Sequence, residues 1–198
     1  MKTEKLHLNK KKPVIISSKK YYVKKSIIMK ISKIYFRRLG TIAHYVGVLC
    51  EYIIVILIVL WLNDLLMIPK FFSFPVRMVG FGVTFFGIFL IGWCCWLQFT
   101  VGHGTTGFSE PTTELVTLGP YAWVRNPMML GQFLFFLGLG VTLNLGAMFI
   151  LLPVIILATH VFTLYIEEPA LKRRFGQKWI DYMKRVPRWI PRFSKLKK

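Results

Sequence analysis

Acidic residues are scarce in this chain of 198 residues, which carries 8 Asp and Glu against 27 Lys and Arg and a formal net charge of +19. A strongly basic balance is one sign of nucleic-acid binding. The other signs of that function are missing, because the sequence has no zinc-ligand pattern and no recognised nucleic-acid motif. The basic residues instead flank apolar runs. We therefore expect no nucleic-acid partner, and we expect the basic residues to meet anionic lipid headgroups.

Cysteine is scarce too, and its three positions predict no metal site. Cys50, Cys94 and Cys95 all lie inside apolar runs, and none has the spacing of a metal ligand. The pattern indicates small apolar core residues. The early lysines are not followed by a short apolar stretch with a small-residue cleavage site, so we expect no signal peptide.

Charged and apolar residues occupy different parts of the chain. Of the 27 basic residues, 13 lie in residues 1–38 and 11 in residues 172–198, which leaves Lys70, Arg77 and Arg125 between them. Hydrophobic residues make up 55% of the sequence, which is more than in average soluble domains. This layout is typical of a polytopic membrane protein with basic ends, and the length suits one domain.

Four apolar runs predict helices that cross the membrane. A transmembrane helix needs about 20 residues, within a range of roughly 17–25. The third run is short by this measure, and we expect it to lie shallowly or to be shielded by protein. Asn144 and Gly146 mark a tight turn, so the last two runs form a helical hairpin. The predicted spans are 42–62, 76–97, 127–143 and 147–166.

Amphipathic segments flank these spans. In residues 21–36, apolar residues recur at helical spacing among lysines, which predicts a basic helix lying in the membrane interface. A second interfacial helix is predicted to begin at Pro169. Its shared apolar face would carry Leu171, Phe175, Trp179 and Tyr182. The predicted fold is therefore an all-α polytopic membrane protein with about four transmembrane helices and amphipathic interfacial helices at both ends.

The charge distribution also predicts an orientation in the membrane. By the positive-inside rule, both basic termini are cytoplasmic. Equal sidedness of the ends requires an even number of crossings, and four crossings satisfy this requirement. The polar loop over residues 98–126 and the segment after Ile166 then lie on the cytoplasmic face.

Two of the few acidic residues, Glu167 and Glu168, stand side by side where the last apolar run ends. Because the hairpin returns the chain, Arg125 at its mouth approaches the same membrane edge. The residue before a proline is pushed out of helical geometry, so Pro169 predicts that the fourth helix ends or bends at Glu168. The carboxylates then lie at a helix junction at the membrane boundary, where a polar ligand could meet them.

A purely structural interpretation of this acidic pair stays open. Glu168 can stabilise the start of a helix through its dipole, which is worth about 0.3–1 kcal/mol. Glu167 can then pair with Arg125 or Lys172. At the start of the third run, Asn126 is a suitable N-cap, because a proline occupies the first helical position after it.

Two histidines share a helix face with a glutamate seven residues later. For His44 and Glu51 in the first span, we expect a packed, hydrogen-bonded pair near the membrane boundary. His160 lies on the face that leads to Glu167. For this histidine, a neutral core residue and a functional group both remain open.

Taken together, the polar loop and the paired glutamates resemble the integral membrane methyltransferase superfamily that contains isoprenylcysteine carboxyl methyltransferases and phospholipid N-methyltransferases. That family carries a Gly-Pro-Tyr motif, an arginine followed by His or Asn and then Pro, a helical hairpin, and a Glu-Glu pair before an amphipathic tail. The resemblance spans about residues 102–191. The matching residues are Gly119, Pro120, Tyr121, Arg125, Asn126, Pro127, Gly131, Glu167, Glu168, Leu171, Phe175, Gly176, Tyr182 and Pro187.

The resemblance implies S-adenosyl-L-methionine as the cofactor, bound at the cytoplasmic end of the hairpin. It also implies a lipophilic acceptor that arrives from the bilayer. The chain would then comprise a basic N-terminal segment, residues 1–40, and a methyltransferase-like domain, residues 41–198. The cofactor region within that domain is about residues 98–191, and the oligomeric state is left open.

The same resemblance assigns roles to individual residues. The implied cofactor-binding residues are Gly102, Gly104, Gly119, Tyr121, Asn126, Glu167 and Glu168. The expected catalytic residues are Arg125, Glu168 and His103. Arg125 would bind a carboxylate of the cofactor or the acceptor by bidentate hydrogen bonds. An amine acceptor must lose a proton, which His103 or Glu168 could take, whereas a carboxylate acceptor needs no base.

Two departures from the family pattern bear on which methyl acceptor is expected. Met129 stands where the family usually has tyrosine. Asn126 stands where the isoprenylcysteine enzymes commonly have histidine, as in the phospholipid enzymes, whereas Arg125 resembles the isoprenylcysteine enzymes. We expect a carboxyl group of isoprenylcysteine type, with a phospholipid amine as the alternative. Two other classes remain as alternatives. They are an NADPH-dependent sterol-type reductase, whose C-terminal hairpin is similar, and, ranked last, a non-catalytic membrane protein.

Overall fold

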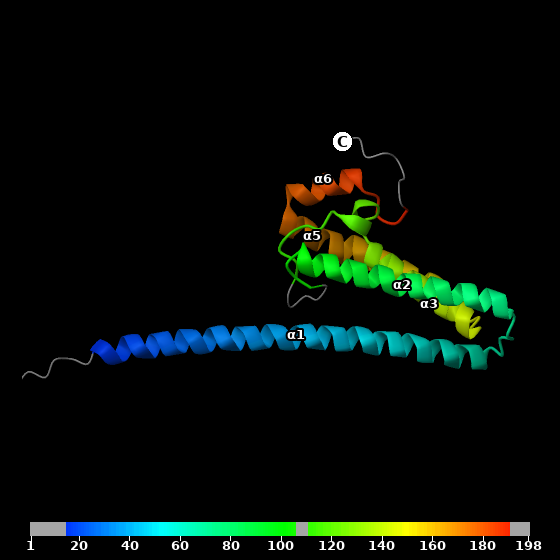
Figure 1. Ribbon diagram of the computed structural model, residues 1–198, viewed down its shortest axis with the longest axis horizontal. Coiled ribbons are helices and arrows are strands. Elements are labelled where there is room, and N and C mark those ends of the chain that lie inside the picture. The colour runs from blue at the N-terminus through cyan, green and yellow to red at the C-terminus, as the bar shows by residue number, and fades with distance from the viewer. Residues whose placement is uncertain (1–14, 106–110, 191–198) are drawn as a thin grey trace, which may run out of the picture.

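The computed structural model describes residues 15–105 and 111–190, and within these ranges the chain is helical without β-strands. Figure 1 shows one long helix set apart from a bundle that contains the others. The helices are α1 (Ile15–Leu65), α2 (Phe74–Thr100), α3 (Pro127–Leu143), α4 (Met148–Phe162), α5 (Glu168–Phe175) and α6 (Gln177–Arg185), with a 3-10 turn η1 (Gly119–Ala122) and a π-helical turn η2 (Thr163–Glu167). The all-α fold is therefore confirmed.

Three helical stretches are long and apolar enough to cross a membrane, and α3 is a shorter apolar helix of 17 residues. The three long stretches are Arg38–Leu65, Phe74–Thr100 and Met148–Phe175. This result confirms a multi-pass integral membrane protein, and α3 begins and ends at the predicted residues. The short third helix is also shielded by protein, as the sequence analysis allowed, because it packs against both α2 and α4.

Glycines allow α2 and α3 to approach closely along their length. A Cβ atom at Gly87 in α2 would lie 2.6 Å from the backbone nitrogen of Phe135 in α3. A Cβ atom at Gly138 in α3 would collide with the backbone of Thr84 in α2. In membranes, where lipid is as apolar as leucine, such close backbone packing is a main source of helix association. The α2–α3 pair therefore forms the rigid base on which the mouth of the hairpin is built.

The turn between α3 and α4 confirms the predicted hairpin. Asn144 ends α3 in the left-handed conformation, with φ of 59°. Its Oδ1 atom accepts hydrogen bonds from the backbone nitrogens of Phe71 and Phe72 at 3.0 and 3.1 Å, and its Nδ2 atom donates to the Phe72 carbonyl at 3.1 Å. One side chain therefore joins this turn to the connection between α1 and α2.

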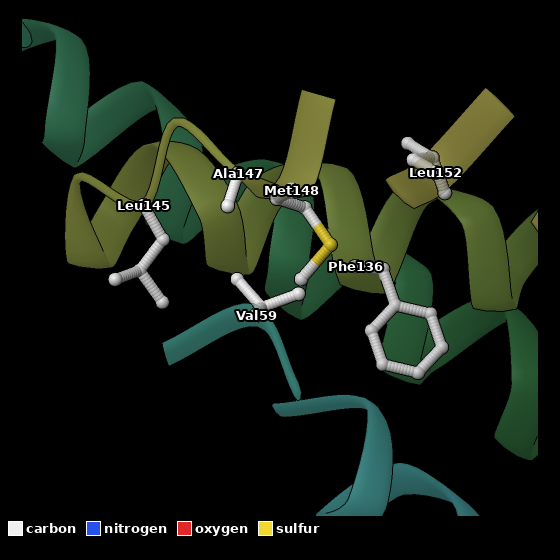
Figure 2. Packing of buried hydrophobic residues seen from close by; sticks show 6 residues of the cluster. All are labelled: Val59, Phe136, Leu145, Ala147, Met148 and Leu152. Carbon is white, nitrogen blue, oxygen red and sulfur yellow. The ribbon is translucent and has the colours of Figure 1, made fainter. Parts of the chain in front are cut away.

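Helix α1 contacts the remaining helices through the C-terminal half of its apolar stretch. Figure 2 shows Val59 of α1 against side chains of α3 and α4 and of the turn between them. This cluster consists of Val59, Phe136, Leu145, Ala147, Met148 and Leu152. Tyr52 of α1 extends the contact by stacking on Phe135, with ring centroids 5.4 Å apart.

The predicted helix over residues 21–36 is indeed helical, but it is continuous with the first span as part of α1. No proline interrupts the sequence from residue 15 to residue 65, so nothing in the chain forces a break. Within the span, the side chain of Glu51 is exposed, and the ring of His44 lies edge-on to Tyr45. A direct pair between His44 and Glu51 stays a prediction.

The junction after α4 differs from the predicted end of a helix. Helix α5 begins at Glu168, one residue before the predicted start, but Glu168 keeps helical angles of φ −61° and ψ −41°. The π-helical turn η2 connects α4 to α5 without leaving helical geometry. A proline ring collides with the carbonyl four residues earlier in a regular helix, and the wider π turn accommodates Pro169.

The predicted C-terminal interfacial helix is wrong as a single element. Gly176, with φ of 54°, separates α5 from α6. Trp179 and Tyr182 of α6 are each only 2% exposed, and they pack against Leu115 of the polar loop. Trp179 and Tyr182 therefore pack against protein, with α6 lying over the mouth of the hairpin (Figure 1).

Candidate functional site

A pocket of about 80 Å³ lies where the polar loop, the N-terminus of α3, η2, α5 and α6 meet. The apolar part of its wall comes mainly from α5 and α6. Its polar wall consists of Gln98, Thr112, Tyr121, Arg125, Asn126 and Glu167. The hairpin thus brings Arg125 and a glutamate to one place, as the sequence analysis predicted.

Arg125 is mostly buried beside Glu168. Its Nη1 atom lies 2.8 Å from Glu168 Oε1, and its guanidinium carbon lies 6.0 Å from the centre of the Trp179 ring. Burial lowers the pKa of Arg125 and the Glu168 carboxylate opposes this shift, but a guanidinium keeps its charge in either case. Within the described residues, its Nε atom is buried and has no hydrogen-bond acceptor. A buried charged donor in this state points to a missing acceptor.

Glu168 is held between two guanidinium groups. Arg188 donates to it through Nε at 2.7 Å and through Nη2 at 2.9 Å, which is a bidentate contact. These hydrogen bonds raise the pKa of Arg188. Glu168 does not line the pocket, although we predicted it as both a cofactor ligand and a catalytic residue. The alternative in which Glu167 pairs with Arg125 is not found, since Glu168 occupies that position.

Glu167 is the acidic residue that lines the pocket. It is the last residue of η2, and its Oε2 atom accepts a hydrogen bond from the Thr163 hydroxyl at 3.3 Å. The two consecutive glutamates therefore have different surroundings. One faces the pocket, and the other is neutralised by arginines behind the pocket wall.

Two further donors are buried at the pocket without partners among the described residues. Asn126 occupies the N-cap position of α3, but its side chain makes no cap hydrogen bond, so the predicted capping role is wrong. Its backbone has φ of −119° and ψ of 57°, unlike a typical N-cap. Asn126 Nδ2 and Trp179 Nε1 are both buried and unpaired, like Arg125 Nε. All three residues line the same pocket.

Tyr121 closes the side of the pocket nearest α2. Its hydroxyl accepts a hydrogen bond from Gln98 Nε2 at 2.6 Å, and its carbonyl accepts one from the Tyr182 hydroxyl at 2.6 Å. Burial raises the pKa values of Tyr121 and Tyr182, so both phenols stay protonated. Gly119 begins the turn that carries Tyr121, and its φ of 58° suits glycine.

The predicted glycine motif has a visible packing reason. A Cβ atom at Gly102 would lie 2.6 Å from the Gln98 carbonyl oxygen, and one at Gly104 would lie 2.6 Å from Thr112 Cα. Thr112 lines the pocket, whereas Gly102 and Gly104 do not. His103 between them is exposed and also lies outside the pocket wall. The two glycines thus let the loop segment that contains Thr112 pack closely at the pocket wall. The binding roles predicted for Gly102 and Gly104 and the catalytic role predicted for His103 stay predictions.

The segment over residues 186–190 lies within the predicted cofactor region and contains Pro187 of the family pattern, but no site role was predicted for its residues. Its carbonyls accept hydrogen bonds from the backbone nitrogens at the mouth: Arg125 donates to Pro187 at 2.8 Å and Asn126 donates to Arg188 at 3.4 Å. Trp189 Nε1 donates to His160 Nδ1 at 2.9 Å, so the histidine is hydrogen-bonded as expected for a packed residue, and a functional role for it stays a prediction. Nothing in the sequence separates Arg188 from the other ten basic residues of the tail.

Comparisons with known proteins identify the family. A family model described as phospholipid methyltransferase matches residues 76–178, which is just over half of the chain. The protein-S-isoprenylcysteine O-methyltransferases of Tribolium castaneum and Mus musculus are 38% and 32% identical over 80 and 98 residues, covering 39% and 48% of this chain. A nickel-cobalt-cadmium resistance protein, NccN, of Alcaligenes xylosoxydans xylosoxydans is 31% identical over 83 residues, or 42% of this chain.

These matches cover only part of the related proteins. The aligned segments span 27%, 35% and 38% of the Tribolium, Mus and Alcaligenes proteins respectively. No solved structure matches the chain. The family match nevertheless covers most of α2, the polar loop, the α3–α4 hairpin, α5 and the first two residues of α6. These elements supply most of the pocket wall, and Trp179 and Tyr182 lie just beyond the match. The chain belongs to the phospholipid methyltransferase family.

Proposed function

We propose that the protein is an integral membrane methyltransferase that uses S-adenosyl-L-methionine and modifies a lipophilic acceptor in the bilayer. The observation that supports it is the set of buried polar groups in one pocket. Arg125, Asn126 and Trp179, which each have a buried donor without an acceptor among the described residues, line the same small pocket as Glu167. Buried polar groups are normally paired, so this arrangement is suited to a ligand that carries both an anionic and a cationic group.

The amino-acid part of S-adenosyl-L-methionine has these two charges. Its carboxylate fits the guanidinium and neutral donors, and its cationic groups fit Glu167. A volume of about 80 Å³ holds an amino-acid head but not a nucleoside, since pockets for drug-sized ligands measure roughly 300–1,000 Å³. The remainder of the cofactor would lie outside this pocket or displace part of its wall.

When bound, the cofactor supplies an electrophilic methyl carbon. The chain's own contribution would be to orient the reacting groups and exclude water. The Glu168 carboxylate, fixed by Arg188, holds Arg125 in place, so the guanidinium is preorganised before a ligand arrives. The Tyr121–Gln98 hydrogen bond fixes the opposite wall.

We propose a carboxyl group of isoprenylcysteine type as the acceptor, because such a group needs no base to remove a proton. Glu168, one of the two predicted bases, is paired with two arginines. A carboxylate acceptor is already ionised near pH 7. The second candidate is a phospholipid amine, and the description of the matching family favours it. In that case His103 would be the base that accepts the proton.

The direct test of the proposed function is binding of S-adenosyl-L-methionine to the purified protein in detergent, measured by calorimetry. We expect Arg125→Ala and Glu167→Gln each to weaken binding by about 10-fold or more. Arg173→Ala and Asp64→Asn are matched controls, because both side chains are exposed and neither lines the pocket. Unchanged binding in both pocket variants would refute the site assignment.

The acceptor class is tested separately by transfer of a radiolabelled methyl group into membrane extracts. Base treatment releases the label as volatile methanol from a methyl ester but not from an N-methyl lipid. Release would support the carboxyl acceptor, and retention in the phospholipid fraction would support the amine acceptor.

We also propose that both termini and the pocket are cytoplasmic and that the basic tails bind anionic headgroups. Both proposals rest on the concentration of Lys and Arg at the two ends of the chain. A cysteine introduced at exposed Glu114, beside the pocket, tests the sidedness. In intact cells, we expect a membrane-impermeant thiol reagent to label this cysteine only after the membrane is permeabilised. Binding to vesicles with and without anionic lipid tests the second proposal.

A further inference from the structure

We propose that Thr163 is a positioning residue that holds the Glu167 carboxylate toward the ligand pocket, an inference that rests on the proposed function. Thr163 is the first residue of η2, and it is fully buried. Its hydroxyl oxygen lies 3.3 Å from Glu167 Oε2 and 3.5 Å from Met129 Sδ. A hydroxyl has one proton, and a carboxylate is a far better acceptor than a thioether. Thr163 therefore donates to Glu167, while Met129 of α3 packs against the hydroxyl.

Other helical threonines in this protein use their hydroxyls differently. Thr84, Thr100 and Thr142 each donate to the backbone carbonyl four residues earlier, at 3.0, 2.8 and 2.8 Å. This backward bond is the usual one for threonine in a helix. Thr163 instead donates forward, to the side chain four residues later. The π turn coincides with this exchange of a backbone acceptor for a functional carboxylate.

The orientation of the Glu167 side chain depends on this hydrogen bond, whereas that of Glu168 does not. Glu168 is oriented by two guanidinium groups, whereas among the described residues Thr163 is the side-chain donor to Glu167. A glutamate without a donor samples several rotamers, and ordering it costs free energy when a ligand binds. The Thr163 hydroxyl, immobilised by burial, lowers that cost in advance. The affinity for the ligand of the pocket is then set partly by Thr163, which does not itself line the pocket.

The first experiment measures S-adenosyl-L-methionine affinity in matched variants. Thr163→Val removes the donor and keeps the shape, so we expect binding about 10-fold weaker, a loss of about 1.4 kcal/mol. Thr163→Ser restores the donor and should stay within about 2-fold of the wild type. Thr142→Val is the control, because Thr142 lies at the C-terminal end of α3, far from the pocket at the N-terminal end, and should leave affinity unchanged.

A double-mutant cycle separates positioning from general damage. In a Glu167→Ala background, which lacks a side-chain acceptor, Thr163→Val should cost much less than it does alone, because each substitution removes the same interaction. Fully additive losses would show that Thr163 affects the fold and not the carboxylate. Such additivity, or equal affinity in the valine and serine variants, would overturn the proposal.

The second experiment needs no cofactor. A hydrophobic carbodiimide reacts with carboxyl groups inside membranes, and the modification of Glu167 is followed by mass spectrometry of the ligand-free protein. We expect severalfold faster modification in Thr163→Val, and wild-type rates in Thr163→Ser and Thr142→Val. Unchanged rates in Thr163→Val would refute the hydrogen bond. If wild-type protein does not bind S-adenosyl-L-methionine, the proposed function fails, while the labelling rates still decide whether Thr163 holds Glu167.

Discussion

The two ends of α3 carry the same residue type in opposite circumstances. At the C-terminal end, Asn144 makes three side-chain hydrogen bonds to the backbone of the α1–α2 connection. At the N-terminal end, Asn126 is equally buried, yet its side-chain nitrogen, Nδ2, has no partner among the described residues. One end of the hairpin is built for stability, and the other keeps donors available at a cost in stability.

This difference extends beyond the two asparagines. At the turn, Arg77 Nε donates to the Thr142 carbonyl at 2.8 Å, so a cation closes the C-terminal end of α3. At the mouth, Arg125 Nε has no acceptor within residues 15–105 and 111–190. Functional sites commonly depart from the pairing rules that hold elsewhere in a fold. The unpaired donors of Arg125 and Asn126 therefore distinguish the mouth of the hairpin from its turn.

The largest effect is expected from Glu168→Ala, which leaves two guanidinium groups facing each other at the mouth. Removing one partner of a largely buried ion pair costs about 3 kcal/mol. We expect a clearly lower thermal unfolding temperature in detergent and loss of ligand binding. Arg173→Ala is the exposed control. Wild-type stability would contradict a structural role for Glu168 and return it to the list of ligand-binding residues.

A second strong effect is expected at the turn end. Asn144→Ala removes three hydrogen bonds and puts alanine, which tolerates the left-handed conformation less well than asparagine, at φ of 59°, so we expect about 2–3 kcal/mol of destabilisation. Asn144→Gly relieves the backbone and loses only the side chain, so it should be less destabilised. Thermal unfolding of the two variants separates these contributions. Cofactor affinity, measured below the unfolding temperature, should remain near the wild-type value in both.

Asn126→Ala should have the opposite effect to the Asn144 variants, with little change in stability and weaker ligand binding. Its side chain makes no cap hydrogen bond, so we expect stability to change by less than about 0.5 kcal/mol, or to rise slightly. Binding of S-adenosyl-L-methionine should nevertheless weaken by about 5-fold to 10-fold, because one donor to the ligand is lost. A marked loss of stability with normal affinity would show that the two ends of α3 do not differ in the way described.

The smallest effect is expected from His103→Asn, which keeps a residue that tolerates the positive φ of 51°. His103 is exposed and outside the pocket wall, so cofactor affinity should not change. With a carboxyl acceptor, turnover should be unaffected too. A large fall in turnover, measured with radiolabelled cofactor, would instead support an amine acceptor that needs a base.

The ends of α3 could be predicted because local chemistry determines them. Pro127 is suited to the first turn of a helix, and Asn144 tolerates the left-handed conformation that ends one. The proximity of Arg125 to the glutamates followed from the hairpin alone. These features depend on a few neighbouring residues and on the chain reversing direction, which the sequence displays directly.

Other features of the site depend on contacts that no local pattern records. The π turn rotates Glu167 relative to a regular helix, so helical spacing could not tell which glutamate faces the pocket. The break at Gly176 turns α6 back over the bundle, so Trp179 is buried in protein. The apolar periodicity of this segment instead suggests an interfacial helix. Arg188 is distinguished from the surrounding basic residues only by reaching Glu168.

Helix α1 has the proportions of a lever. Its 51 residues correspond to about 77 Å at 1.5 Å per residue, whereas the hydrocarbon core is about 30 Å thick. The part from residue 15 to residue 37 extends about 35 Å beyond the span. Because the helix is continuous, a tilt of about 10° in the span would displace its first turn by about 6 Å. Changes in bilayer thickness, which alter helix tilt, would thus be amplified into movement of the basic segment relative to the pocket.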